Sequence, residues 1–324
     1  MSHYADNKII KTPTEHDAVR ILNDALGKTV KSISRFPTGL AHYVYDVTTD
    51  DGESFVIRLT RPDMRYFFEG ALSWYEPLIS RNVPLPTLYY ASVDETQFGF
   101  PVMIMERLPG KDLDEVYVHL STEQKHRLAD KIIAIQRSVA MLPRGKGYGF
   151  ARSSDDPALY PHWIDVLEES IKRSTHRLEK SGLLDNEMIS RTRQTIYAHE
   201  GYFRSVLPLC FLDDTTTKNV LVDNTGCLAG IVDVDAVAFG DPLLTLSLTR
   251  MALLSRGYDT EYTDYWAEKL NLTPQQRHAV NLYTALCCLD FMSEIGQSFN
   301  KDVPTSIDQA KAEKFMRILA SLLN

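Results

Sequence analysis

One stretch, residues 210–242, constrains the fold of this chain more than any other. It reads CFLDDTTTKNVLVDNTGCLAGIVDVDAVAFGDP, in which apolar runs alternate with polar turns. The runs Val220–Val222 and Leu228–Val232 flank the turn sequence Asp-Asn-Thr-Gly at 223–226. Two short β-branched and apolar runs around such a turn predict a β-hairpin.

Three polar residues gather at one end of this hairpin. Asp214 precedes the first strand, Asn219 opens it, and Asp233 follows the second strand, so their side chains could converge. Phosphoryl transfer needs a carboxylate that accepts the proton of the attacking hydroxyl, and oxygen ligands for Mg²⁺ on the nucleotide phosphates. An Asp, an Asn five residues later and a further Asp after the next hairpin follow the order of a kinase catalytic loop.

The stretch resembles the catalytic core of the aminoglycoside phosphotransferase-like small-molecule kinases, which share their fold with protein kinases and choline kinase. Its closing Gly-Asp-Pro is also similar to that family. The resemblance implies that Asp214 is the general base. It implies that Asn219 and Asp233 are metal ligands, with Asp235 as a further candidate. It also implies that Asp241 braces the catalytic loop.

Each of these residues also has a structural alternative, although the hairpin, the second acid and the Gly-Asp-Pro together favour the catalytic interpretation. Asp213 and Asp214 could start a turn, and Asp241 before a proline is a good helix N-cap. One position departs from the resemblance, because Leu212 stands where the family usually has a histidine two residues before the base. Leucine can pack but cannot hydrogen-bond, so the loop geometry is in question and an inactive, nucleotide-binding pseudokinase stays an alternative.

Residues 30–60 have the layout of a nucleotide-binding lobe: strand, glycine loop, strand, turn, strand. The expected strands are 30–36, 42–49 and 54–60. Gly39 would let backbone N–H groups approach phosphates, and the resemblance implies a phosphate-binding role for Arg58 in the third strand. An arginine on the wet face of an edge strand is the alternative. Glu69, in a helix expected at 64–81, is the preferred partner for Arg58.

A second stretch, MIMERLPGKDL at 103–113, resembles the inter-lobe hinge of the same kinases. Hinge backbone can hydrogen-bond an adenine edge, so Met105, Glu106 and Leu108 are expected to bind the nucleotide base. An apolar edge strand ending at Pro-Gly would read the same way. The implied fold is α+β, a bilobal protein-kinase-like fold with a small antiparallel-sheet N-lobe and a mainly helical C-lobe. The expected divisions are N-lobe 1–105, hinge 106–110 and C-lobe 111–324.

Apolar periodicity predicts helices through most of the second half of the chain. The expected helices cover about 122–142, 163–178, 186–207 and, with breaks near 257 and 273, most of 243–324. Tyr283, Cys287, Asp290 and Glu294 share one helix face by their spacing. The resemblance implies that late helices wall the substrate cleft. Asp290 and Glu294 are therefore candidates to bind an ammonium group, with Tyr283 beside the substrate ring; a solvated acidic stripe is the alternative.

Composition restricts the partners. The net charge is −8, with 35 basic and 43 acidic residues, and no basic cluster suggests nucleic-acid binding. No run of 18 apolar residues predicts a membrane span, and the first residues lack an apolar signal region, so we expect a cytoplasmic protein. The four cysteines lack Cys-x-x-Cys spacing, which indicates reduced, buried thiols rather than zinc ligands.

Together these residues and the family that they resemble predict ATP- or GTP-dependent phosphorylation, with Mg²⁺, of a hydroxyl on a small molecule, with a cationic molecule as one candidate. An aminoglycoside-like antibiotic is the substrate class that the resemblance favours. Choline, homoserine, methylthioribose and sugars are alternative substrates. The rival functions are the pseudokinase and a metal-dependent hydrolase that would use Asp213, Asp214 and Asp233.

Overall fold

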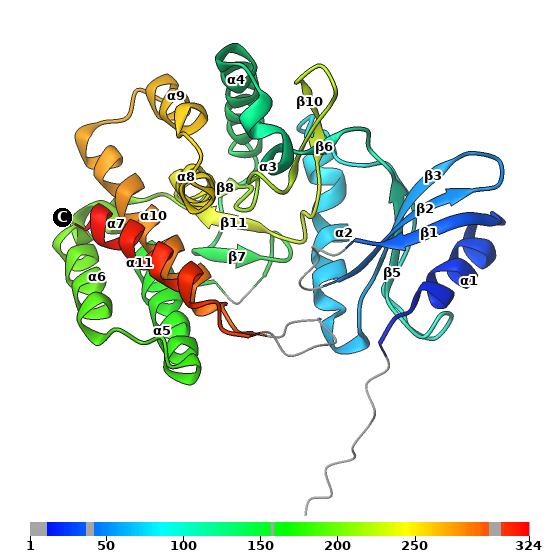
Figure 1. Cartoon of the computed structure of the whole chain (residues 1–324), viewed down its shortest axis with the longest axis horizontal. Coiled ribbons are helices and arrows are strands. Elements are labelled where there is room, and N and C mark those ends of the chain that lie inside the picture. The colour runs from blue at the N-terminus through cyan, green and yellow to red at the C-terminus, as the bar shows by residue number, and fades with distance from the viewer. Residues whose placement is uncertain (1–11, 37–41, 157–158, 298–305, 324) are drawn as a thin grey trace, which may run out of the picture. The chain divides into compact units, whose positions relative to one another are not determined.

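The computed structural model describes residues 12–36, 42–156, 159–297 and 306–323 (Figure 1). Within these residues the chain divides into two compact units. The sheet unit comprises residues 12–69 and 86–107, and the helical unit comprises residues 70–85 and 108 onward. The mixed architecture is the predicted α+β class, with an antiparallel sheet first and helices after it.

The sheet unit contains a five-stranded antiparallel sheet in the order β1-β2-β3-β5-β4. Its strands are β1 (Val30–Arg35), β2 (Tyr43–Thr49), β3 (Ser54–Leu59), β4 (Leu88–Ser92) and β5 (Val102–Glu106). Alternate residues of β2 are buried, as the pleat of a strand requires. Helix α1 (Glu15–Leu26) begins at a capping box formed by Thr14 and Asp17 and ends at Gly27, which has a φ of 67°.

The helical unit is built from long helices around one apolar core. Helix α2 (Tyr66–Ile79) contributes residues to both units. The other helices are α3 (Leu113–Val116), α4 (Thr122–Val139), α5 (Trp163–Ser181), α6 (Asn186–Ala198), α7 (Glu200–Ser205), α8 (Leu243–Arg256), α9 (Glu261–Lys269), α10 (Pro274–Ser293) and α11 (Gln309–Leu322). Helix α10 packs against α5, α8 and α11, which explains why most of its residues are buried.

Two small sheets organise the polar loops of the helical unit. One has the order β10-β9-β6 and the other β7-β11-β8. Their strands are β6 (Lys111–Asp112), β7 (Gly149–Ala151), β8 (Leu209–Phe211), β9 (Val220–Val222), β10 (Leu228–Ile231) and β11 (Val237–Gly240). The predicted hairpin is confirmed, since β9 and β10 pair antiparallel with Val222 opposite Leu228. The expected helix 186–207 is instead two helices, because the chain breaks at His199.

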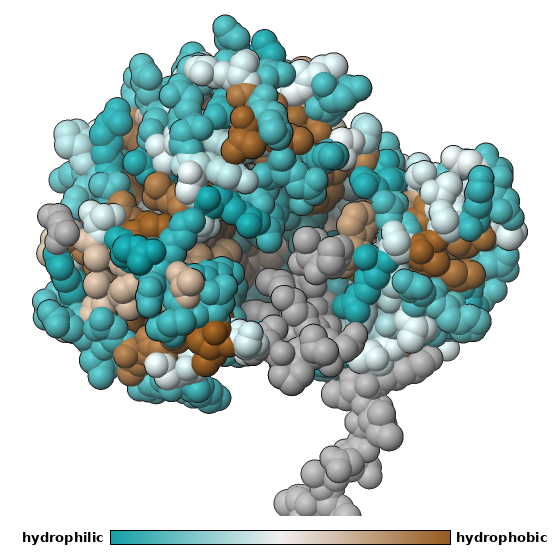
Figure 2. Space-filling view, viewed as in Figure 1, coloured by the Kyte–Doolittle hydropathy of each residue, from teal (hydrophilic) through white to brown (hydrophobic). Residues whose placement is uncertain are grey.

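The surface is mainly polar on the face that is shown. On the face shown in Figure 2, hydrophilic residues predominate and apolar residues form separate patches between them. Of the helices in the described part of the chain, none combines the length and apolar character needed to cross a membrane. Cys210, Cys287 and Cys288 are buried thiols as expected, whereas Cys227 in the hairpin turn is exposed.

Candidate active site

The loop between β8 and β9 fixes Asp214 and Asn219 relative to each other. The amide nitrogen of Asn219 donates to the backbone carbonyl of Asp214 at 2.9 Å. The backbone N–H groups of Asn219 and Val220 both donate to the carbonyl of Thr216 at 3.1 Å. The hydroxyl of Thr216 donates to Oδ1 of Asp214 at 3.0 Å. The five-residue spacing therefore closes a compact turn that presents the Asp214 carboxylate with one oxygen already oriented.

The second strand of the hairpin brings two more carboxylates to the same unit. The N–H of Val232 donates to the carbonyl of Asn219 at 2.9 Å, which ties the end of β10 to the start of β9. Asp233 then takes a left-handed backbone conformation with a φ of 62°. Such a conformation is costly for a residue other than glycine and is common at functional sites.

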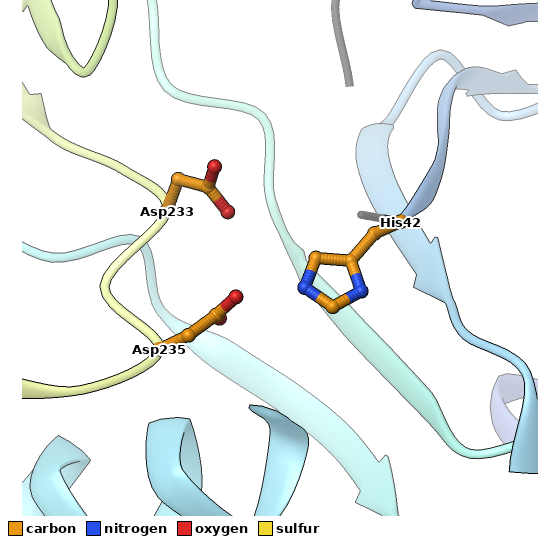
Figure 3. A group of neighbouring side chains, drawn as sticks. All are labelled: His42, Asp233 and Asp235. Atoms are coloured by element: carbon orange, nitrogen blue, oxygen red, sulfur yellow. The ribbon is translucent and has the colours of Figure 1, made fainter. Parts of the chain in front are cut away.

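Asp233 and Asp235 leave this segment on the same side, as Figure 3 shows. One carboxylate oxygen of each lies within 4.8 Å of the other. His42, also drawn in Figure 3, belongs to the sheet unit, where its ring packs against the rings of Phe67 and Phe68. The acidic pair is thus a feature of the helical unit alone.

The two acids at the start of the loop, Asp213 and Asp214, have raised pKa values. The pKa of Asp214 is raised to about 7, first by loss of hydration and then by the negative charges of Asp213 and Asp233. Asp214 keeps exposed surface, so its loss of hydration is partial, and the two neighbouring charges are the firmer cause. Burial likewise raises the pKa of Asp213 to about 6, and the charge of Asp235 adds to this effect. Four carboxylates thus interact at one place.

The donor set fits a hard divalent cation. Carboxylate and amide oxygens are the ligands that Mg²⁺ prefers. Because the amide nitrogen of Asn219 is used on the Asp214 carbonyl, the amide oxygen of Asn219 is the atom that can face a cation. Asp233 and Asp235 offer carboxylate oxygens that lie within 4.8 Å of each other. Asn219 and Asp233 are therefore the residues that would hold such an ion, with Asp235 as a third.

Asp241 holds the start of α8 rather than the catalytic loop itself. Its Oδ1 accepts the N–H of Leu243 at 3.0 Å, and its Oδ2 accepts the hydroxyls of Tyr202 at 2.7 Å and Tyr283 at 2.9 Å. Burial raises the pKa of this carboxyl. The contact with the N–H of Leu243 is that of a residue at the start of a helix, which was the structural alternative for Asp241. The hydrogen bond from α8 to the catalytic loop comes from Thr245.

Arg58 lies inside the sheet unit. Strand β3 pairs with β2 and β5, and only 5% of Arg58 is exposed, which overturns the alternative of a wet edge strand. Its guanidinium lies over the ring of Phe68, 5.4 Å from the centroid. Glu69 forms an ion pair with Arg65, at 3.5 Å, rather than with its predicted partner Arg58.

The hinge-like stretch divides between the two units. Met105 and Glu106 end β5, an inner strand between β3 and β4, which overturns the edge-strand alternative. The carboxylate of Glu106 accepts the N–H of Thr87 at 3.1 Å and its hydroxyl at 2.8 Å. Leu108 is buried in the helical unit, where its side chain occupies the space that a Cβ at Gly230 would need. Gly39 lies outside the described residues.

The late helix α10 places its polar residues differently from the prediction. Tyr283 was expected beside a substrate ring, but it is only 1% exposed and hydrogen-bonds to Asp241, so that expectation is wrong. A continuous helix face can pass from the core to the surface along its length. Asp290 and Glu294 lie toward the exposed end of that face.

Both of these acids are already engaged with α5. Asp290 accepts Arg173 at 3.1 Å through each oxygen and the hydroxyl of Ser174 at 2.9 Å. Arg177 lies 3.9 Å from both Asp290 and Glu294. Two arginines therefore balance the two acids, and a cationic substrate would have to compete with them.

Several buried polar residues around the loop were not singled out from the sequence. They are Gln136, Thr216 and Thr245. A signal was present, because Gln136 and Thr245 interrupt apolar helix faces and Thr216 sits in a run of three buried threonines. Such residues need hydrogen-bond partners inside the protein, and here the partners belong to the loop that carries Asp214.

Known proteins share this sequence pattern and fold. A model of the phosphotransferase enzyme family matches residues 32–279. No curated protein matches by sequence. A thermostable mutant of aminoglycoside phosphotransferase APH(4)-Ia, in ternary complex with AMP-PNP and hygromycin B, is 15% identical with a TM-score of 0.66, over 95% of this chain and 98% of that one.

Two other solved structures agree. ADP-bound aminoglycoside phosphotransferase APH(2'')-Ib is 18% identical with a TM-score of 0.62, over 96% of this chain and 97% of that one. The GDP complex of wild-type aminoglycoside 2'-phosphotransferase-IIIa is 15% identical with a TM-score of 0.66, over 95% and 97%. At these identities the structures establish the fold alone.

Proposed function

Because the chain belongs to the phosphotransferase enzyme family, we propose that it transfers the γ-phosphoryl group of ATP or GTP to a hydroxyl of an aminoglycoside-like small molecule. Enzymes of this family transfer a phosphoryl group to an alcohol group of the acceptor. The observation that carries the proposal is the loop that joins Asp214 and Asn219 within a single turn. The hairpin adds Asp233 to that turn, since the charge of Asp233 acts on Asp214.

Asp214 is proposed as the general base. The hydroxyl proton of the acceptor passes to its carboxylate while the hydroxyl oxygen forms a bond to the γ-phosphorus. The bond from that phosphorus to the bridging oxygen breaks, and the nucleoside diphosphate leaves. Thr216 holds Oδ1, which leaves Oδ2 to meet the acceptor. The neighbouring charges that raise the pKa of Asp214 also make its carboxylate a stronger base for the acceptor proton.

The remaining proposed roles concern charge. Mg²⁺, when held by Asn219 and Asp233, supplies the positive charge that stabilises the transferred phosphoryl group. The same charge would relieve repulsion among the clustered carboxylates. Arg58 is proposed to bind nucleotide phosphates, because a guanidinium can hold two phosphate oxygens at once. Met105, Glu106 and Leu108 are proposed to contact the nucleotide base, and Gly39 its phosphates.

The acceptor class rests on the proteins of the same fold. One of them is described in complex with hygromycin B together with AMP-PNP. Asp290 and Glu294 are proposed to face such an acceptor, since the thiol of Cys287 on the same helix is close enough to both Asp290 and Asp214 to be affected by their charges. The Asp290→Asn, Glu294→Gln double variant should raise KM for a cationic acceptor and leave the nucleotide KM unchanged. Equal KM values in parent and variant would remove the two acids from the acceptor site.

The function is tested by magnesium-dependent nucleotide turnover with ATP and GTP. The acceptor panel contains aminoglycosides, choline, homoserine, methylthioribose and simple sugars. Asp214→Asn should lower kcat by ~10²–10⁴-fold, with nucleotide binding intact in calorimetry. Asp223→Asn is the matched control, because Asp223 is an acid of the same hairpin whose Oδ1 only holds the turn.

The outcomes separate the candidate functions. A parent that phosphorylates an acceptor, with Asp223→Asn active and Asp214→Asn inactive, supports the proposal. An Asp214→Asn variant that keeps the parent kcat would show that the assignment of this loop is wrong. A folded parent that binds Mg²⁺-nucleotide but turns over none of the acceptors would instead favour the pseudokinase.

A further inference from the structure

The catalytic loop begins at a residue whose side chain cannot hydrogen-bond, yet its backbone is bound on both sides. Leu212 is 2% exposed. Its N–H donates to Oε1 of Gln136 at 3.1 Å, and its carbonyl accepts Nε2 of Gln136 at 2.7 Å. One amide side chain from α4 thus pairs with both backbone groups of one residue, as a neighbouring strand would.

A second helix reaches the same carbonyl. The hydroxyl of Thr245 on α8 donates to the carbonyl of Leu212 at 2.7 Å. Nε2 of Gln136 also donates to the hydroxyl of Thr215 at 3.3 Å, inside the loop. Gln136 is only 6% exposed and Thr245 is fully buried. Away from water these hydrogen bonds are strong, and any group left without its partner is costly.

This arrangement fixes the position of the proposed base. Leu212 lies two residues before Asp214, so holding both peptide groups of Leu212 limits the rotations that would move the carboxylate. Misplacement of a reacting group by about 1 Å can cost roughly 100-fold in rate. The leucine side chain itself contributes apolar packing, but it makes no hydrogen bond that would orient the loop.

We propose that Gln136 is a positioning residue for the phosphotransfer reaction, which it serves by clamping the backbone of Leu212, with Thr245 as its partner. Through the backbone of Leu212, the clamp supplies hydrogen bonds that the leucine side chain cannot make. This inference rests on the proposed function, because it assigns to Gln136 a role in placing Asp214.

The test compares Gln136→Leu with Val139→Ala. Gln136→Leu removes the hydrogen bonds of the Gln136 amide to Leu212 and Thr215 while keeping similar bulk, and it leaves the hydrogen bond of Thr245 in place. Val139 is buried on the same helix and its apolar side chain makes no hydrogen bond, so Val139→Ala loosens the core and leaves the hydrogen bonds to Leu212 in place. Gln136→Leu should lower kcat by roughly 10- to 100-fold, with both KM values within about twofold of the parent. Val139→Ala should lower the melting temperature but keep kcat. Assays run well below both melting temperatures.

Hydrogen exchange supplies a readout that needs no turnover: the amide of Leu212 should exchange at least tenfold faster in Gln136→Leu than in the parent, and unchanged in Val139→Ala.

The results separate the positioning role of Gln136 from the proposed function of the chain. Loss of kcat in Gln136→Leu but not in Val139→Ala, with faster exchange at Leu212, supports the proposal. Unchanged kcat, or equal kcat losses in both variants, overturns it. A parent without turnover on any acceptor overturns the proposed function and the positioning role with it. Exchange at Leu212 then decides only whether the clamp holds the loop.

Discussion

Removing one hydroxyl, by Tyr283→Phe, should destabilise the fold without altering substrate binding. The Tyr283 hydroxyl donates to Oδ2 of Asp241 at 2.9 Å and accepts Nε1–H of Trp163 at 2.7 Å. All three side chains are buried. The phenylalanine ring would keep the apolar contacts, so the variant isolates the two hydrogen bonds.

The expected magnitude follows from the partners left behind. Trp163 would retain a buried N–H without an acceptor, at a cost of about 1–3 kcal/mol. Asp241 would lose one of three donors, which adds about 1–2 kcal/mol, toward the low end for a charged acceptor because Tyr202 and the N–H of Leu243 remain. The free energy of unfolding should therefore fall by roughly 2–5 kcal/mol.

The effect of Tyr283→Phe on the free energy of unfolding should depend on pH, because the hydroxyl is bonded to the titratable Asp241. Burial raises the pKa of Asp241 in the folded state, so the unfolded chain loses this proton first and stability falls as pH rises through the folded-state pKa. The Tyr283 hydrogen bond lowers that pKa and thus favours the ionised form. Its loss should cost more above the folded-state pKa of Asp241, where the carboxyl is ionised, than below it, where the carboxyl is protonated.

The assay is urea unfolding at several pH values, with acceptor and nucleotide KM measured in parallel. Tyr197→Phe is the matched control, because Tyr197 is exposed on α6 and its loss should change stability by less than about 0.5 kcal/mol. A Tyr283→Phe variant as stable as the control would refute the reasoning. A raised acceptor KM at unchanged stability would instead return Tyr283 to the substrate site.

Three further predictions concern the loop, the metal and the thiols. Leu212→Ala should lower the free energy of unfolding by roughly 2–5 kcal/mol, as truncation of buried leucines does; an unchanged melting temperature would mean that Leu212 gives no apolar support. Asp233→Ala should weaken binding of magnesium-nucleotide far more than binding of metal-free nucleotide in calorimetry, and equal losses would exclude direct ligation. In native protein only the exposed Cys227 should react with a thiol reagent near pH 8, because burial raises the pKa of the other three thiols, whereas all four should react after unfolding; a second fast thiol would contradict this.

Local chemistry made much of the fold predictable. The hairpin follows from its turn, in which Oδ1 of Asp223 accepts the N–H groups of Thr225 and Cys227. Helix α1 begins and ends where Thr14 and Gly27 indicate, because caps act within one turn. The order of Asp214, Asn219 and Asp233 was likewise sufficient to group them, since a hairpin returns the chain to its starting end.

Long-range pairing was not predictable in the same way. Strand β11 (Val237–Gly240) lies between β8 and β7, and β7 comes from a stretch that reads as a loop. Helix spacing grouped Tyr283 with Asp290, but periodicity does not tell how far along a face the core extends. The contacts of α10 with α5, α8 and α11 decide that, and they join segments distant in sequence. The hydrogen bonds of Gln136 and Thr245 to Leu212 were not predicted either, because they also join segments distant in sequence.

Hydrogen bonds to the backbone N–H and carbonyl of a residue do not depend on the side chain of that residue. Gln136 and Thr245 contact the N–H and carbonyl of Leu212, groups that every residue except proline offers. A leucine at position 212 is therefore compatible with a loop that is hydrogen-bonded from two helices distant in sequence, because the side chain at 212 has only to fill apolar space.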